Sequence, residues 1–341
     1  MIPRLILGAA LLAVLAVPGR AQLAERPLPT PARILATMLA APALIDYEGT
    51  KVISTVRGER AETVTILEAS KRLGGLRLEF LSPESVSGRL IVDDGVTAWQ
   101  YEPALHLVVR GPSFVQGAAR AERAAEIASR YRARVLGREA VIGRTTVVLD
   151  LVPADEGVRR LWIDEASGVV LRTEERDARG EILYVSYFSR ISYSLNLPLA
   201  LFRFRPPAGA KRVDFFLSGP AARSLEALRA QTGGSRMLRP RLLDRFAFRE
   251  GRRVQHGAFS AVAATYTDGA SVVTVFQTPT ARMAFPAVGR LVSTAAGPAR
   301  FLDVGYFRLL VWQAGEVTLA VIGNVPPAVL MRIAEALRTN P

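Results

Sequence analysis

Few side chains in this chain of 341 residues are of the types that do chemistry. There are two histidines, His106 and His256, and two acidic pairs, Asp93-Asp94 and Asp164-Glu165. No second metal ligand stands at a typical spacing from either histidine. The acidic pairs lie in segments that we expect to form hairpin turns, where aspartate bonds to the backbone. We therefore interpret these residues as structural, and a calcium or glycosidase role for the acidic pairs is the alternative.

The common nucleophile and phosphate-binding motifs are also missing. Ser113, in GPSFV, lacks the second glycine of a nucleophile elbow, and no glycine-rich phosphate loop carries a lysine. The chain has no cysteine, which excludes disulfides, zinc–thiolate sites and a thiol for lipid attachment. The sequence thus predicts no catalytic, metal-binding or cofactor-binding residues, and a protein that is not an enzyme.

The first residues, MIPRLILGAALLAVLAVPGRAQ, have the layout of a secretory signal peptide. Arg4 is followed by an apolar run from Leu5 to Val17 and then by small residues before Ala21. The run is short for a membrane span, which needs roughly 20 apolar residues. We expect the signal peptide, residues 1–21, to be cleaved and the protein to be periplasmic or otherwise extracytoplasmic. An uncleaved N-terminal anchor is the alternative.

The formal net charge is +13, and it falls to about +11 when Arg4 and Arg20 leave with the signal peptide. Basic proteins are drawn to anionic surfaces. Outside the cytoplasm these are phospholipid head groups or an acidic partner rather than nucleic acid. The positive charges are scattered, however, and arginine greatly outnumbers lysine, so an arginine-rich composition explains the charge equally well.

Residues 22–206 combine two helices with many short antiparallel strands. Thr30 and Pro31 are suited to begin the first helix, which we expect to end at Pro42. A second helix is expected over roughly 118–134. Tight turns, among them Asp94-Gly95, separate the strands, as in an antiparallel meander.

Such a meander needs one face covered, and two helices cover a long sheet poorly. We expect a strongly curved half-barrel sheet with the helices on its concave side and an apolar cavity between them. The residues predicted to line this cavity are a helical stripe and two strand tryptophans: Ile34, Leu35, Met38, Leu39, Trp99 and Trp162. A solid core formed by the same side chains is the alternative.

The segment FRFRPPAGAKR indicates a linker over 207–212, because Pro206-Pro207 cannot continue a strand ladder. Past it, residues 213–341 read as a smaller α+β domain. Its expected features are a helix at 221–231, hairpins with tips at Asp268-Gly269 and Ala314-Gly315, and a closing helix from Pro326 to about Arg338. The fold class predicted for the whole chain is therefore α+β, with two domains.

Several of these segments resemble the MucB/RseB family, whose first domain is similar to LolA- and LppX-like lipoprotein carriers. LWIDEASGVVLRTEERDARGEILYVSYF and YEGTKVISTVRGERAETVTILE resemble strands of that first domain. ATYTDGASVVTVFQTP resembles the hairpin of the second domain, and VTLAVIGNVPPAVLMRIAEALR resembles its closing strand, corner and helix. At the corner, Asn324 stands where the family usually has an acidic residue. The resemblance covers nearly all of the chain after the signal peptide.

The resemblance implies a second domain that helps to hold the extracytoplasmic part of a membrane-bound anti-sigma factor. Binding would shield that factor from proteolysis and so negatively regulate an envelope-stress sigma factor. Lipids or lipoprotein acyl chains entering the first domain would relieve the protection. The resemblance points to partner contacts at Tyr266, Asp268, Gly323 and Asn324. A periplasmic lipid or lipoprotein carrier is the alternative function.

The signal peptide gives a direct prediction for the exported protein. Cleavage after Ala21 should leave a chain that begins at Gln22, because the small residues before this point suit signal peptidase. Intact-mass analysis of exported protein measures this directly. A mass that includes residues 1–21, in protein recovered with the membrane fraction, would contradict the prediction.

Overall fold

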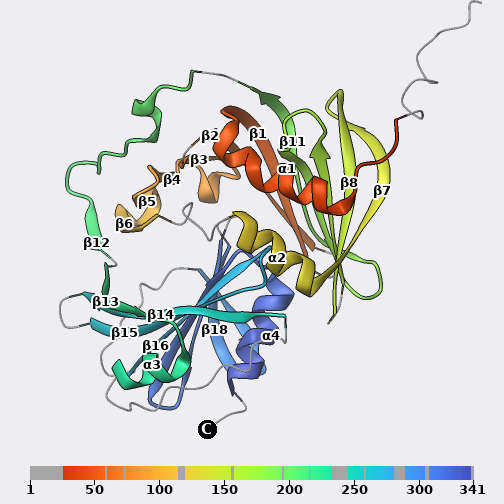
Figure 1. Cartoon of the computed structure of the whole chain (residues 1–341). Coiled ribbons are helices and arrows are strands. Elements are labelled where there is room, and N and C mark those ends of the chain that lie inside the picture. The colour runs from red at the N-terminus through yellow and green to blue at the C-terminus, as the bar shows by residue number, and fades with distance from the viewer. Residues whose placement is uncertain are drawn as a thin grey trace, which may run out of the picture.

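The computed structural model describes residues 26–57, 60–72, 74–113, 120–154, 157–193, 196–214, 216–231, 245–256, 259–279, 289–303 and 307–338. The predicted signal peptide lies outside these ranges. Within them, no helix is both long enough and apolar enough to cross a bilayer. The strands form two sheets, of 12 and 8 strands, and Figure 1 shows them as two bodies, one above the other.

The first sheet is the larger one, and its strands run in the order β12-β6-β5-β4-β3-β2-β1-β11-β10-β9-β8-β7. The strands are β1 Tyr47–Arg57, β2 Arg60–Lys71, β3 Gly75–Ser82, β4 Leu90–Asp93, β5 Thr97–Glu102, β6 Leu107–Pro112, β7 Tyr131–Val141, β8 Arg144–Pro153, β9 Val158–Asp164, β10 Val170–Arg176, β11 Ile182–Ser192 and β12 Lys211–Asp214. Two meanders, β1–β6 and β7–β11, join where β1 pairs with β11. The sheet is curved, as expected (Figure 1). It is also open, because β12 and β7 stand at opposite ends of this order and do not pair.

Two helices cover one face of this sheet, which we call the inner face (Figure 1). Helix α1, Pro31–Leu44, is capped by Thr30, whose hydroxyl oxygen accepts from the Arg33 N–H at 3.3 Å. It does not end at Pro42 as predicted. The proline forfeits only one backbone bond, and the helix closes with the Ile45 N–H on the carbonyl of Ala41 at 2.9 Å.

Helix α2, Arg120–Arg130, is shorter than predicted. The predicted helical residues from Tyr131 onward belong instead to β7, which pairs with β8 over its whole length. Arginine, alanine and glutamate favour helices locally, but here the pairing with a neighbouring strand decides the conformation. Because β7 lies at the far edge from β6, the connection that carries α2 must cross the sheet, and this crossing places α2 on the inner face.

Side chains on β8 and β9 alternate between the two faces, as the period of a strand requires. The inner-face residues pack with the helices into one buried cluster: Ile34, Leu35, Leu39, Ile127, Tyr131, Val147, Leu149, Leu151, Leu161 and Ile163. The opposite, outer face carries ion pairs between neighbouring strands. Arg160 of β9 donates two hydrogen bonds to Asp150 of β8, at 2.7 and 3.0 Å. Within β10, Arg176 also pairs with Glu174 at 2.5 Å.

The predicted linker, residues 207–212, is not a free connection. β12 begins at Lys211 and pairs in parallel with β6, and the Lys211 N–H donates to the carbonyl of His106 at 2.9 Å. The His106 ring also contacts the carbonyl of Ala208 at 3.1 Å. The segment therefore extends the first sheet, and the chain enters the second sheet between Asp214 and Phe216.

The second domain is an α+β unit, as predicted, with strand order β13-β14-β15-β16-β20-β19-β18-β17. Its elements are β13 Phe216–Ala222, α3 Leu225–Gln231, β14 Ala247–His256, β15 Phe259–Thr267, β16 Val272–Pro279, β17 Arg290–Thr294, β18 Gly297–Asp303, β19 Arg308–Ala314, β20 Val317–Gly323 and α4 Pro327–Arg338. The turn predicted at Asp268-Gly269 is confirmed. The second turn lies at Gly315-Glu316, one residue later than predicted, because Ala314 still pairs with Val317. Helix α4 buries Leu330 and Ile333 in a core that also holds Trp312.

The inner-face assignment predicts a contrast between two leucines. Leu149 is fully buried and Leu136, on β7, is 46% exposed. Leu149→Ala should lower the free energy of unfolding by about 2–5 kcal/mol, because it leaves a cavity under the helices. Leu136→Ala should change it by about 0.5 kcal/mol or less. Urea denaturation measures both, and equal losses would show that the faces are wrongly assigned.

Candidate functional site

The tip of the β15–β16 hairpin, residues 268–271, reaches from the second domain to the first. The Tyr131 hydroxyl, at the start of β7, donates to Asp268 at 2.5 Å. The Arg159 guanidinium, on β9, donates to the Ser271 hydroxyl at 3.0 Å and to the Ala270 carbonyl at 3.4 Å. The tip therefore joins the two domains through residues from two strands of the first sheet.

Asp268 has no exposed surface, and its carboxylate is held from several sides. The backbone N–H groups of Ala270 and Ser271 donate to it at 3.0 and 2.6 Å, and Arg245 lies 3.2 Å away as an ion-pair partner. Burial raises the pKa of Tyr131 above its ordinary value, and the neighbouring Asp268 adds to this. The phenol therefore stays protonated and remains a donor to the carboxylate.

Gly269 lets the tip pack directly on α2. Its φ is +85°, and a Cβ at this position would lie 2.8 Å from the Ile127 backbone nitrogen and 2.8 Å from the Glu126 Cβ. Only glycine avoids both the strained backbone and the clash. Its carbonyl accepts from the Arg123 side chain at 3.3 Å. The tip is thus fitted to α2 by shape as well as by polar contacts.

A cavity of about 310 Å³ opens on the inner face beside this contact. Its apolar lining comes from both helices and from strands of the first sheet: Met38, Ile53, Ile127, Leu151, Leu161, Val170 and Tyr184. On one side it is bounded by Ala270, Arg308 and Asn324 of the second domain. The second domain therefore forms part of its wall.

The same cavity has an excess of positive charge. Lys51, Arg123, Arg159 and Arg308 line it, and Glu175 is the one acidic residue among the lining residues. Burial alone would lower the pKa of Arg159, but the charge of Glu175 raises it above its ordinary value. Arg159 therefore keeps its charge. A cavity with apolar walls and a basic end can hold an acyl chain that carries an anionic head group.

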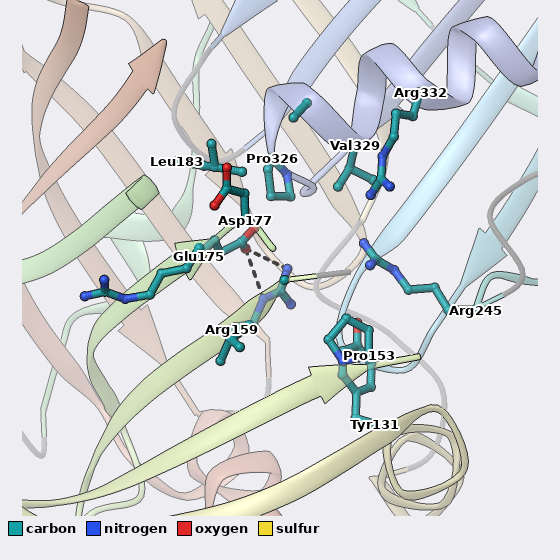
Figure 2. A pocket seen from close by; sticks show the side chains of 14 residues that line it. Tyr131, Pro153, Arg159, Glu175, Asp177, Leu183, Arg245, Pro326, Val329 and Arg332 are labelled. Carbon is teal, nitrogen blue, oxygen red and sulfur yellow. Dashed lines mark hydrogen bonds and ion pairs between the residues drawn. The ribbon is translucent and has the colours of Figure 1, made fainter. Parts of the chain in front are cut away.

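A second pocket, of about 200 Å³, lies between the domains and is drawn in Figure 2. Arg159 and Glu175 line it as well as the first cavity, and their side chains pair at 2.7 Å. Figure 2 shows Arg245 and Arg332 pointing into this pocket from the second domain. The Arg159–Glu175 pair thus stands in the wall between the two spaces.

A third pocket, of about 520 Å³, lies under the proline-rich segment before α1. Arg138 holds this segment by donating to the carbonyls of Arg26 and Pro27 at 2.7 and 3.2 Å. Ile34, one of the residues predicted to line the cavity, lines this pocket and not the first cavity.

The structure brings only part of the predicted cavity lining to the cavity. Met38 lines it, whereas Leu35 and Leu39 are packed in the solid cluster of the inner face. Both tryptophans were assigned to the wrong face of the sheet. Trp162 alternates with Leu161 and Ile163, so its ring lies on the outer face, where its N–H donates to Glu139 at 2.7 Å.

Trp99 is likewise on the outer face, where its ring packs against Phe204 at 5.7 Å between centroids. It pairs with Val92, the neighbour of the inner-face residue Ile91. The prediction failed because a tryptophan in a strand gives no sign of which face it occupies. The alternation of Leu161 and Ile163 with charged neighbours was the signal that could have placed Trp162.

The residues predicted to contact a partner lie in or near the domain junction. Tyr266 is 3% exposed in the core of the second domain, and Asp268 is enclosed between the domains. Gly323 ends β20, and the side-chain oxygen of Asn324 accepts from the Val272 N–H at 2.7 Å. In this arrangement neither Tyr266 nor Asp268 presents its side chain to a partner, so their role in binding stays a prediction.

The acidic pairs bind to the backbone or to neighbouring side chains at turns, as expected. Asp93 accepts from the Gly95 N–H at 2.8 Å, and Asp94 accepts from the N–H groups of the next residues of its hairpin. Asp164 pairs with Arg144 and accepts from the Tyr193 hydroxyl at 2.8 Å.

Across the described ranges, no group of three His, Cys, Asp or Glu side chains is placed to hold a metal ion. The side chain of His256 lies outside the described residues.

Comparison with known proteins gives a consistent match. The family model of the MucB/RseB N-terminal domain matches residues 30–203. The fold is similar to that of the Pseudomonas aeruginosa MucA/MucB complex, at 17% identity and a TM-score of 0.52, over 89% of this chain and 96% of that one. It is also similar to MucB in complex with MucA(peri), at 18% identity and a TM-score of 0.52, over 89% and 97% of the chains. No curated protein sequence matches the chain.

The cavity predicts opposite outcomes for two neighbouring tryptophan substitutions on α1. Met38→Trp should extend into free space and change the free energy of unfolding by less than about 1 kcal/mol. Leu35→Trp should overpack the solid cluster and lower it by about 1–3 kcal/mol. Thermal and urea denaturation of both variants test this. A loss at position 38 as large as that at position 35 would contradict the cavity.

Proposed function

The chain belongs to the MucB/RseB family, and we propose that it is a non-enzymatic extracytoplasmic regulator that binds the extracytoplasmic part of a membrane anti-sigma factor. The observation that carries this proposal is the fold shared with MucB in complex with MucA(peri) over 89% of the chain. That length includes the second domain, which a carrier built from the half-barrel alone does not need.

We propose further that the cavity of the first domain senses a lipidic ligand. Each buried methylene contributes about 0.8 kcal/mol, so its apolar wall can hold an acyl chain without polar recognition. Arg123, Arg159 and Lys51 add attraction for an anionic head group, and salt weakens such attraction where the charges are exposed. A ligand in this cavity would touch both domains, as it must if its binding is to affect the domain that holds the partner.

A periplasmic carrier of lipid or lipoprotein is the second candidate function. The apolar cavity on the inner face favours it, because enclosure of an acyl chain is all that a carrier needs. The two functions differ in the second domain, which in a carrier would have no partner to hold. The extracytoplasmic location common to both is supported by the layout of the first residues.

The test is a binding measurement with the full chain lacking residues 1–21. The extracytoplasmic segment of a single-span anti-sigma factor from the same organism should bind with a Kd of about 1 µM or tighter. A saturating fatty acid should weaken this binding by roughly tenfold. Calorimetry measures both. Fatty-acid binding without any binding of the anti-sigma segment would favour the carrier, and binding of neither would contradict both functions.

A further inference from the structure

We infer that Arg159 is the residue through which an anionic ligand in the cavity releases the β15–β16 hairpin from the first domain. The inference rests on the proposed binding of an amphiphile and names the route by which that ligand acts. Arg159 lines both the cavity and the interdomain pocket. It therefore stands where a ligand of the first domain and the tip of the second domain meet.

The contacts of Arg159 are divided between the domains. Within the first domain it pairs with Glu175, at 2.7 Å from Nη2 and 3.0 Å from Nε. Across the junction it donates to the hydroxyl of Ser271 and to the carbonyl of Ala270. The Arg159 side chain is only 15% exposed, so an incoming ligand must exchange with these partners rather than add to them.

An anionic ligand should replace the contacts of Arg159 to the second domain more readily than its contact to Glu175. The two hydrogen-bond acceptors there are neutral, while the charge of Asp268 also attracts Arg159. Hydrogen bonds to an ionised acceptor are roughly twice as strong as those to a neutral one. A carboxylate or phosphate that enters the cavity should displace Ser271 and Ala270 before it displaces Glu175. A neutral head group offers no such gain and should leave the tip bound.

The loss of these two contacts falls on a segment with few other polar ties to the first domain among the described residues. The tip keeps the Tyr131–Asp268 bond and the Arg123 bond to Gly269, and Arg123 also lines the cavity. A ligand that binds both Arg123 and Arg159 would release their contacts to the tip. Among the contacts described above, the Tyr131–Asp268 bond would then be the one polar contact left between the tip and the first domain. Coupling is reciprocal, so a released tip should also strengthen binding of the ligand.

The experiment compares parinaric acid, a fluorescent fatty acid, with its methyl ester, which has the same chain without the charge. The readout is hydrogen exchange of the backbone amides of residues 268–271, measured by mass spectrometry, with β20 as the internal reference. In the full chain, parinaric acid should speed exchange at the tip by about tenfold. The methyl ester should bind and leave the exchange within about twofold.

Three variants assign the effect to Arg159. Arg159→Gln should show fast exchange at the tip without ligand and no further response to either probe. Ser271→Ala, which removes one contact, should give a smaller rise if Arg159→Gln fails to fold. Arg160→Gln is the matched control: it changes the neighbouring arginine, which binds Asp150 on the outer face, and should respond like the parent.

The outcomes separate this inference from the proposed function. If parinaric acid binds and weakens the complex with the anti-sigma segment but leaves exchange at 268–271 unchanged, the role of Arg159 is wrong and the function stands. An equal response to the methyl ester would also overturn it. If neither probe binds, lipid sensing and this inference fail together.

Discussion

The buried carboxylate of Asp268 must be satisfied by hydrogen bonds and opposite charges, and the arrangement of the two domains depends on this constraint. An ionised carboxylate removed from water costs several kcal/mol unless hydrogen bonds and opposite charges satisfy it. Here its partners come from its own turn, from Arg245 and from Tyr131 of the other domain. Tyr131 can reach it only because β7 begins directly after α2, and the glycine beside it lets the turn rest on that helix.

The cavity is a consequence of the same junction. The helices fill one part of the inner face with a solid cluster, and the second domain bounds one side of the space that they leave. The charged residues of the junction therefore stand at the end of an apolar cavity. This explains how the cavity could respond to a ligand, as we propose for a regulator of this family.

Local signals in the sequence predicted much of the fold. The Asp-Gly turns, the cap at Thr30 and the helix that follows Pro326 depend on neighbouring residues, and they are where they were expected. Two features depended on distant pairing and were missed: the strand β7, and the strand β12, which overlaps the predicted linker at residues 211–212. The faces of Trp99 and Trp162 were also missed. The candidate site was hardest to predict, because Arg159 and Ser271 are far apart in the chain and no local pattern indicates that they meet.

The most direct test of the account is a distance measurement across the junction. The chain has no cysteine, so spin labels can be attached at Leu136→Cys in the first domain and Arg223→Cys in the second. Pulsed electron resonance should give one narrow distance distribution in the parent, and a broad one when Tyr131→Phe and Asp268→Ala are combined. A broad distribution in the parent, or an equally narrow one in the variant, would show that this contact does not hold the domains together.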